Sequence, residues 1–234
     1  MHTLENVIWQ ALGTRHAQFA ESSKSARRFI PEVTSLAGLR QPSPDAYESL
    51  AVLLPSQGTT ALFLDEPYSK QRGWSLVAGM PLLQMAWKNA ELTELPSLAR
   101  QSQDEEDTIL ELGVTESGEM IALTALTKPG PFNTRTHELG SYFGIRRNGR
   151  LVSMAGERLK VPGFTEVSAV CTHPEHTGHG YAAVLMNRVM QGILERGETP
   201  FLHVREDNLR AIDLYRRLGF QTHQRVHLAV IRKD

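Results

Sequence analysis

The chain has 234 residues, of which 41% are hydrophobic and 22% are charged, the composition of a folded globular protein with room for one large domain or two small ones. Its 25 basic and 26 acidic residues leave a net charge of −1, which excludes the strongly basic surface that attracts a phosphate backbone, so we expect no nucleic-acid partner. The single cysteine, Cys171, excludes an internal disulfide and a Cys-x-x-Cys zinc site and fits a reducing compartment.

Signals for membrane insertion or export are not evident in the sequence. The N-terminal residues contain Glu5 and lack a basic start followed by an apolar run, and no stretch of about 18 uninterrupted apolar residues occurs. We therefore expect no membrane partner and a cytoplasmic location.

The first hundred residues predict a mixed α/β region. The elements expected there are an apolar helical pattern at Leu4, Val7, Ile8 and Leu12, an extended segment at Arg27–Val33, a helix at Asp45–Leu54, and strands at Thr60–Leu64 and Trp74–Trp87. The stretch Arg100–Thr108 is polar and acidic with nothing to bury, which is typical of a linker. We place a domain boundary in it, between residues 1–104 and 105–234.

The second region predicts alternating strands and helices. A strand at Ile109–Val114 precedes a helix that the hydroxyl of Thr115 or Ser117 would cap and that proline would end near residue 129. The pair Asn148-Gly149 between the extended runs Ser141–Ile145 and Arg150–Ala155 indicates a β-hairpin. The remaining segments are predicted as a strand at Glu166–Thr172, a helix at Gly180–Arg196, a strand at Pro200–Val204, a helix at Asn208–Leu218 and a strand at Phe220–Ile231. This alternation is typical of an α/β layer with a partly parallel sheet.

A glycine-containing turn joins the strand that ends at Thr172 to the helix that begins at Gly180. Unpaired amides at a helix N-terminus, together with glycines that let an anion approach the backbone, suit a diphosphate. The turn lacks the Lys-Ser/Thr of a P-loop and does not match the GxGxxG pattern. The alternative is that Gly178 and Gly180 serve only a tight connection between strand and helix.

Three histidines in this turn, His173, His176 and His179, are spaced by three residues and invite a metal interpretation. Their spacing crosses a proline and a glycine turn, and no carboxylate or thiolate pattern completes a site. We expect no metal, and we interpret the histidines as polar lining beside a phosphate.

A second informative segment follows the next predicted strand. Asn208 is a credible helix N-cap and Gly219 a credible stop. Because a helix repeats every 3.6 residues, Asn208, Ala211 and Tyr215 lie along one of its faces.

The order and spacing of these two segments resemble the GCN5-related N-acetyltransferases, particularly the FR47-like branch, over roughly residues 108–234. The resemblance implies a mixed central sheet flanked by helices, with the N-terminal half resembling a degenerate copy of the same fold. It also implies that the turn binds the diphosphate of acetyl-coenzyme A, that the preceding strand pairs with the pantetheine arm, and that the next helix contacts the arm and the sulfur. The implied cofactor-binding residues are Val170, Cys171, Thr172, His176, Thr177, Gly178, His179, Gly180, Tyr181, Ala182, Asn208, Ala211 and Tyr215. Gly180 and Ala182 match the family pattern Arg/Gln-x-x-Gly-x-Gly/Ala, whereas Thr177 departs from it and removes a side-chain contact.

The family chemistry is direct attack of an amine on the thioester. Tyr215 is the expected general acid, since a phenol stays protonated at neutral pH, and packing onto the sheet is its alternative role. Glu166 is the first candidate for the base and Glu157 the second, with a salt bridge as the alternative for Glu157. A backbone amide near Val170 would polarise the carbonyl. Cys171, in an apolar strand, is not expected to be a nucleophile.

The expected acceptor is a primary amine of a small molecule or a peptide. Arg135 and Phe132 lie in the region where such enzymes cover the acceptor, and Arg135 could clamp a carboxylate or be a solvated loop residue. The N-terminal half is expected to form part of the acceptor pocket and to bind no second cofactor. We expect a monomer or a homodimer. The alternative function is a non-catalytic sensor or interaction module that binds acetyl-coenzyme A.

Overall fold

The computed structural model describes residues 3–88 and 108–234, so the predicted linker lies outside the described residues except for Thr108. The N-terminal part contains α1 (Val7–Gly13), the 3-10 turn η1 (Ala17–Phe19), β1 (Ala20–Ser22), β2 (Ala26–Phe29), β3 (Ala37–Leu39), α2 (Pro44–Leu53), β4 (Thr59–Leu64) and β5 (Trp74–Trp87). The predicted helix at Asp45–Leu54 (α2) and the strands β4 and β5 are confirmed, and α1 covers part of the predicted helical pattern. The short strands β1 and β3 were not predicted. Strands β1, β2 and β3 form a small antiparallel sheet.

The C-terminal part contains the remaining elements. They are β6 (Ile109–Leu112), η3 (Val114–Glu116), α3 (Ser117–Thr127), η4 (Thr136–Leu139), β7 (Tyr142–Arg147), β8 (Arg150–Val161), β9 (Phe164–Thr172), η5 (Pro174–His176), α4 (Tyr181–Glu195), β10 (Thr199–Arg205), α5 (Leu209–Arg217) and β11 (Phe220–Lys233). The hairpin is confirmed, with Asn148 at φ 50° and Gly149 at φ 74°, the backbone that a two-residue turn of this type requires.

The predicted cap of α3 is wrong in its chemistry. Neither Thr115 nor Ser117 caps the helix, because the 3-10 turn η3 precedes it and Glu116 stands at the N-cap without a side-chain cap bond. The Glu116 carboxylate instead accepts a hydrogen bond from the Gly113 amide at 2.8 Å. Asn208 does cap α5, since its side chain accepts a bond from the Ala211 amide at 3.2 Å.

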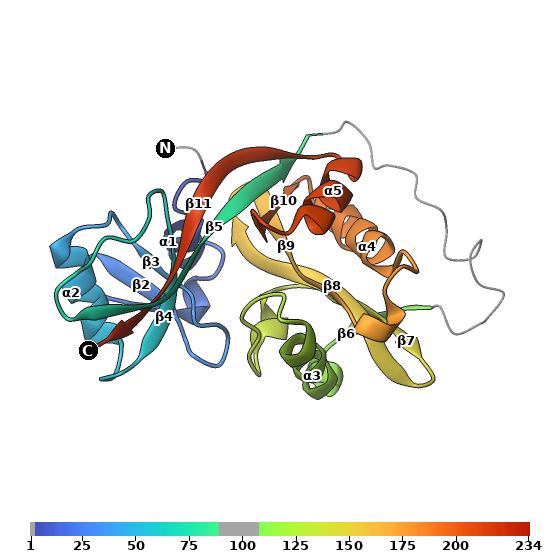
Figure 1. Cartoon of the computed structure of the whole chain (residues 1–234), viewed down its shortest axis with the longest axis horizontal. Coiled ribbons are helices and arrows are strands. Elements are labelled where there is room, and N and C mark those ends of the chain that lie inside the picture. The colour runs from blue at the N-terminus through green and yellow to red at the C-terminus, as the bar shows by residue number, and fades with distance from the viewer. Residues whose placement is uncertain (1–2, 89–107) are drawn as a thin grey trace.

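One eight-stranded sheet runs through both parts in the order β4-β11-β5-β10-β9-β8-β7-β6. Strand β5 lies between β10 and β11 and is antiparallel to both, so the N-terminal part supplies a central strand of the sheet. Figure 1 shows β5 and β11 as long ribbons that span both parts of the molecule. The pair β9 and β10 is parallel, which confirms the mixed sheet flanked by helices.

Alternate residues of the C-terminal strands face two different cores, as the two-residue period of a strand requires. Tyr142, Leu151 and Met154 pack toward α3. Phe143, Val152 and Ala155, each the next residue along, pack toward α4 and α5. In Figure 1, α3 lies on the side of the sheet away from α4 and α5.

The N-terminal core continues into the C-terminal strands. Apolar residues of α1 form one buried cluster with Leu159 and Val161 of β8 and Phe201 of β10. Burial of this shared apolar surface holds the two parts together. Within residues 3–88 and 108–234, no helix has the length and apolar character needed to cross a membrane.

Because β5 is a central strand, we expect the fragment 105–234 not to fold alone. Removal of residues 1–104 would take away β5, the common neighbour of β10 and β11, and would expose the apolar residues that α1 covers. Circular dichroism and amide NMR dispersion of this fragment, with and without co-expressed 1–104, test the expectation. Cooperative melting of the fragment by itself would instead mean that the boundary separates two independent domains.

Candidate functional site

The site begins where β9 and β10 separate. The two strands pair at only three positions, and the last of these joins Glu166 to Phe201. Beyond that point the strands diverge, and a cleft of about 670 Å³ opens between them. Parallel strands that part in this way leave backbone groups facing the cleft instead of a neighbouring strand.

The cleft collects the cofactor-binding residues that the sequence predicts. It is lined by Val170, Cys171, Thr172, His176, Thr177, Gly178, His179, Gly180, Tyr181, Ala182, Asn208, Ala211 and Tyr215, and also by Lys128, Arg158, His203, Arg205, Arg210 and Arg217 among others. No residue of 3–88 lines it, so the expected contribution of the N-terminal half to the pocket wall is not found in the described part of the chain. That half lies behind the wall instead, where Phe63 packs against the ring of His203 at 4.5 Å.

A β-bulge shapes the cleft wall on β9. Ala169 has φ 53°, and neither Ala169 nor Val170 has a partner in the register with β8, which passes from Cys171 to Ser168. A non-glycine residue in this left-handed region costs about 1–2 kcal/mol, and such strain gathers at functional sites. The bulge turns the backbone of Ala169 and Val170 out of the ladder at the cleft wall.

The N-terminus of α4 forms one end of the cleft. Gly178 at φ 88° and Gly180 at φ 78° shape the turn, and no side chain caps the helix at Gly180. The first amides of a helix point along its axis, where the helix dipole favours an anion. The Thr177 hydroxyl donates to the Pro174 carbonyl at 3.2 Å, so this side chain is used within the turn.

The cleft is cationic although the chain as a whole is nearly neutral. Its lining includes Lys128, Arg158, Arg205, Arg210 and Arg217, and no aspartate or glutamate among the described residues. Three of these cations have carboxylate partners outside the lining, namely Glu166 for Arg158, Asp207 for Arg205 and Asp213 for Arg217. A lining of one sign concentrates anions. Sequence reasoning missed these side chains. The seven-residue spacing of Arg210 and Arg217 was the available signal, because it puts both on one face of α5.

Tyr215 and Cys171 line the same cleft, and both stay protonated. Burial raises the pKa of the Tyr215 phenol to about 12, and the nearby Cys171 adds to the rise. Burial also raises the pKa of the Cys171 thiol to about 11. A thiol with such a pKa is a poor nucleophile near neutral pH, whereas the phenol is a proton donor.

Glu166 is fully buried and does not line the cleft. Its carboxylate accepts from Arg158 Nε at 2.9 Å and Nη2 at 2.7 Å, from the Leu159 amide at 3.2 Å, and contacts His203 Nδ1 at 2.7 Å. Burial alone would raise its pKa, but the charge and hydrogen bonds of Arg158, aided by His203, hold the pKa at about 2. Two partners of Glu166, Arg158 and His203, therefore line the cleft, whereas the Glu166 carboxylate itself does not.

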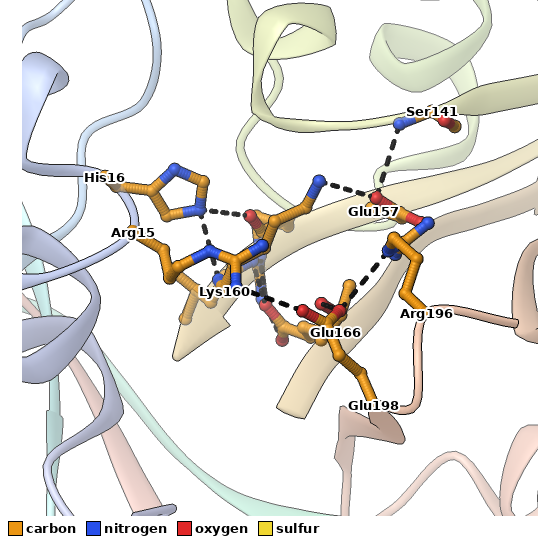
Figure 2. Close-up of polar contacts among 11 residues, drawn as sticks. Arg15, His16, Ser141, Glu157, Lys160, Glu166, Arg196 and Glu198 are labelled. Carbon is orange, nitrogen blue, oxygen red and sulfur yellow. Dashed lines mark hydrogen bonds and ion pairs between the residues drawn. The ribbon is translucent and has the colours of Figure 1, made fainter. Parts of the chain in front are cut away.

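Glu157 belongs to a separate ionic network (Figure 2). Its carboxylate contacts Lys160 Nζ and Arg196 Nη2, both at 2.7 Å. Arg196 also contacts Glu198, which in turn pairs with Arg15 of the N-terminal part at 3.2 Å. The structure thus places Glu157 in an interface between the two parts of the chain, and it does not line the cleft.

The two predicted acceptor residues lie in different surroundings. Arg135 is absent from the cleft lining and forms a bidentate pair with Glu138 at 2.7 and 2.8 Å. Phe132 packs edge-on against Tyr142, with ring centroids 5.6 Å apart, and lines a small cavity beside the cleft. Phe132 therefore lies near the bulge residue Ala169, whereas the Arg135 guanidinium is engaged by Glu138.

One group in the described residues has metal-ligand spacing. His173, Glu175 and His176 have ligand atoms within 4.8 Å of one another. However, the Glu175 amide donates to His173 Nδ1 at 3.3 Å, and the Glu175 side chain is 78% exposed. His179, the third histidine of the sequence spacing, is not part of the group, whereas Glu175 brings a carboxylate that was not expected from the sequence. The expectation that the site holds no metal stays a prediction.

Comparisons with known proteins agree with this geometry. A family model described as FR47-like protein matches residues 142–228. A crystal structure of a protein assigned to the GNAT family, from Novosphingobium aromaticivorans, is 35% identical with a TM-score of 0.87, and the match covers 100% of both chains. A GCN5-related N-acetyltransferase from Kribbella flavida shares the fold at 18% identity and a TM-score of 0.60, over 94% of this chain and 95% of that one. The N-alpha-acetyltransferase RimI of Mycobacterium tuberculosis is 38% identical over 100 residues, which span 40% of this chain and only 60% of that protein.

We expect Glu166→Gln to lower the free energy of unfolding by about 3–5 kcal/mol at pH 7, as when one partner of a buried ion pair is removed. The folded pKa of about 2 lies below the usual 4.5, so this contribution is complete above about pH 4.5 and is lost as the pH falls toward 2. Urea denaturation of wild type and variant between pH 7 and pH 3 should give a difference that shrinks below pH 4.5. Glu175→Gln, at an exposed position, is the control. A difference that stays constant across this range would contradict the assignment.

Proposed function

The chain belongs to the GNAT family, the GCN5-related N-acetyltransferases, and on this premise we propose that it transfers the acetyl group of acetyl-coenzyme A to a primary amine of a small molecule or a peptide. The observation that carries the proposal is the single cationic cleft on which the parted strand β9, the uncapped N-terminus of α4 and the phenol of Tyr215 converge. The name of the curated relative, an N-alpha-acetyltransferase, supports an amine acceptor.

The residues of the cleft fit acetyl-coenzyme A, which supplies the thioester. The amides at Gly178–Ala182 would hold the diphosphate, and Arg210 offers further positive charge to its phosphates. Arg205 and Arg217 also line the cleft, each beside an exposed aspartate partner. The backbone of Val170–Thr172 would pair with the amide groups of the pantetheine arm, as an added strand does. The lack of an arginine or glutamine at Thr177 leaves backbone donors to bind the diphosphate.

The chain's own groups would assist the transfer at two atoms. The amide of Val170, turned out of the ladder by the bulge, would donate to the carbonyl oxygen of the thioester. The Tyr215 phenol would give its proton to the sulfur as the carbon–sulfur bond breaks and the carbon–nitrogen bond forms. The attacking amine loses one proton in the same reaction, which balances the proton that the sulfur receives.

From the sequence, Glu166 or Glu157 was expected to act as the base that removes a proton from the acceptor amine. No carboxylate lines the described cleft, and a Glu166 whose pKa is about 2 is a weak base with its oxygens engaged. We propose that Glu166 positions Arg158 and His203, and that the acceptor attacks as the neutral amine, after an ammonium form has given its extra proton to solvent. The proton that the nitrogen loses as the amide forms also passes to solvent, and Tyr215 regains from solvent the proton that it gave to the sulfur. The rate should then rise with pH as more of the acceptor is neutral.

The same observation favours a second candidate function. A cleft without a carboxylate base, and a turn with Thr177 in place of arginine or glutamine, also suit a module that binds acetyl-coenzyme A without turnover. Such a module would gain thermal stability from the coenzyme and would release no thiol with any acceptor.

We expect Tyr215→Phe to lower kcat by about a hundredfold or more, the contribution of a positioned general acid, with little change in the KM for acetyl-coenzyme A. Since burial raises the pKa of Tyr215 to about 12, wild-type activity should show no alkaline decline from this group below about pH 10. A thiol-release assay across amines, amino acids and peptides measures both effects.

Tyr47→Phe is the matched control, because Tyr47 is a buried tyrosine in the α2 core outside the cleft. It should leave kcat unchanged. Equal release by wild type and Tyr215→Phe would remove Tyr215 as the acid. Stabilisation by acetyl-coenzyme A without release on any acceptor would favour the binding module.

A further inference from the structure

The hydroxyl of Tyr142 is a buried polar group without a protein partner. Tyr142 is 1% exposed, and among the described residues its hydroxyl has no hydrogen-bond partner. Close packing holds the Tyr142 ring in place: a Cβ on Gly156 would lie 2.2 Å from the ring, and Phe132 packs against it edge-on. Since an unpaired buried hydroxyl is costly in a folded protein, this one calls for a ligand or a water molecule.

The hydroxyl belongs to a residue that lines a small cavity next to the cleft. The cavity holds about 10 Å³ and is bounded by the loop at residues 129–132, by Tyr142 and by Arg158. The bulge residue Ala169 and its neighbour Ser168, with Pro129 and Arg158, line both the cavity and the cleft. The cavity therefore lies beside the bulge, on the α3 side of the sheet, and has room for a single oxygen-sized group.

Arg158 brings a second polar group to this cavity. Glu166 takes up its Nε and Nη2, and no hydrogen bond of Nη1 is formed within the described part of the chain. This Nη1 faces the loop, because a Cβ on Gly130 would lie 3.7 Å from it. A guanidinium nitrogen and a phenol, both able to donate, thus border one small space.

The charge around the cavity is already balanced. The guanidinium of Arg158 is paired with Glu166. The next neighbour, His203, has its Nε2 3.1 Å from Gln84 Nε2, a donor that also binds the Leu4 carbonyl. His203 Nε2 therefore accepts and its Nδ1 carries the proton toward Glu166. The negative charge of a second carboxylate would have to share the single guanidinium with Glu166. A neutral carbonyl oxygen brings no charge and needs only hydrogen-bond donors.

We infer that this cavity receives the carbonyl oxygen adjacent to the acceptor amine, so that the acceptor is an α-amino amide or the N-terminus of a peptide. The inference rests on the proposed function and names the substrate class of the same site. Tyr142 and Arg158 would donate to that oxygen, and the neighbouring amine would then lie close to the bulge at Ala169, where the thioester carbonyl is expected.

Three acceptors with a common carbon skeleton test the inference: L-alaninamide, L-alanine and isopropylamine, which carry a carboxamide, a carboxylate and neither group. Tyr142→Phe removes only the hydroxyl and keeps the ring. We expect the KM for L-alaninamide to rise about fivefold to tenfold, as for the loss of one hydrogen bond. The KM for isopropylamine and for acetyl-coenzyme A should not change. Comparing variant with wild type for each acceptor cancels the different basicities of the amines.

Tyr47→Phe again controls for the chemical change, and thermal melting checks the fold. We expect the melting temperature of Tyr142→Phe to be equal to or above that of wild type, because an unpaired buried hydroxyl is lost. An unchanged KM for L-alaninamide would mean that the hydroxyl binds only water and would overturn the inference. A rise confined to L-alanine would overturn the neutral carbonyl as the ligand. Both results leave release from isopropylamine intact, whereas no release from any acceptor would instead refute the acetyltransferase function.

Discussion

The buried pair of Arg158 and Glu166 lies where the sheet divides, and the site depends on it. Glu166 makes the last register pair of β9 with β10, and its carboxylate joins Arg158 of β8 to His203 of β10, two residues that line the cleft. The Glu166–His203 hydrogen bond joins β9 to β10, and the Arg158–Glu166 ion pair joins β9 to its other neighbour, β8. A buried charge without its partner is strongly destabilising, so Glu166 holds the three strands together at the point where the pairing of β9 with β10 ends. The cleft can then open beyond it without loosening the sheet.

The N-terminal part supports the same junction from behind. Its strand β5 completes the sheet beside β10, and Gln84 of this strand hydrogen-bonds with His203 and with Gln224 of β11. The chain thus forms one continuous sheet from two sequence regions. The described N-terminal residues support the cleft by packing against β10 and His203, and they do not line it. We propose that residues 1–104 and 105–234 are regions of one folding unit.

Local chemistry made part of this architecture predictable. Asn148-Gly149, the Asn208 cap and the glycines before α4 each act over a few residues, and most helices and strands around them were predicted with small errors in their ends. The exception is β8, which was expected to end at Ala155 and continues to Val161. The insertion of β5 between β10 and β11 was not predictable, because it pairs residues such as Trp87 and Phe220 that are far apart in the sequence. The sequence indicated Glu166 but not its partner Arg158, although the two are only eight residues apart, because the strand that carries Arg158 was expected to end at Ala155. The roles assigned to Tyr215 and to the turn at Gly178–Ala182 stay predictions.

The most direct measurement is a crystal structure of the full chain with acetyl-coenzyme A. The account predicts the diphosphate against the amides of Gly178–Ala182, the thioester carbonyl within hydrogen-bond distance of the Val170 amide, and the sulfur beside the Tyr215 hydroxyl. Coenzyme bound outside the cleft between β9 and β10, or a thioester on the far side of the sheet from Tyr215, would contradict the account.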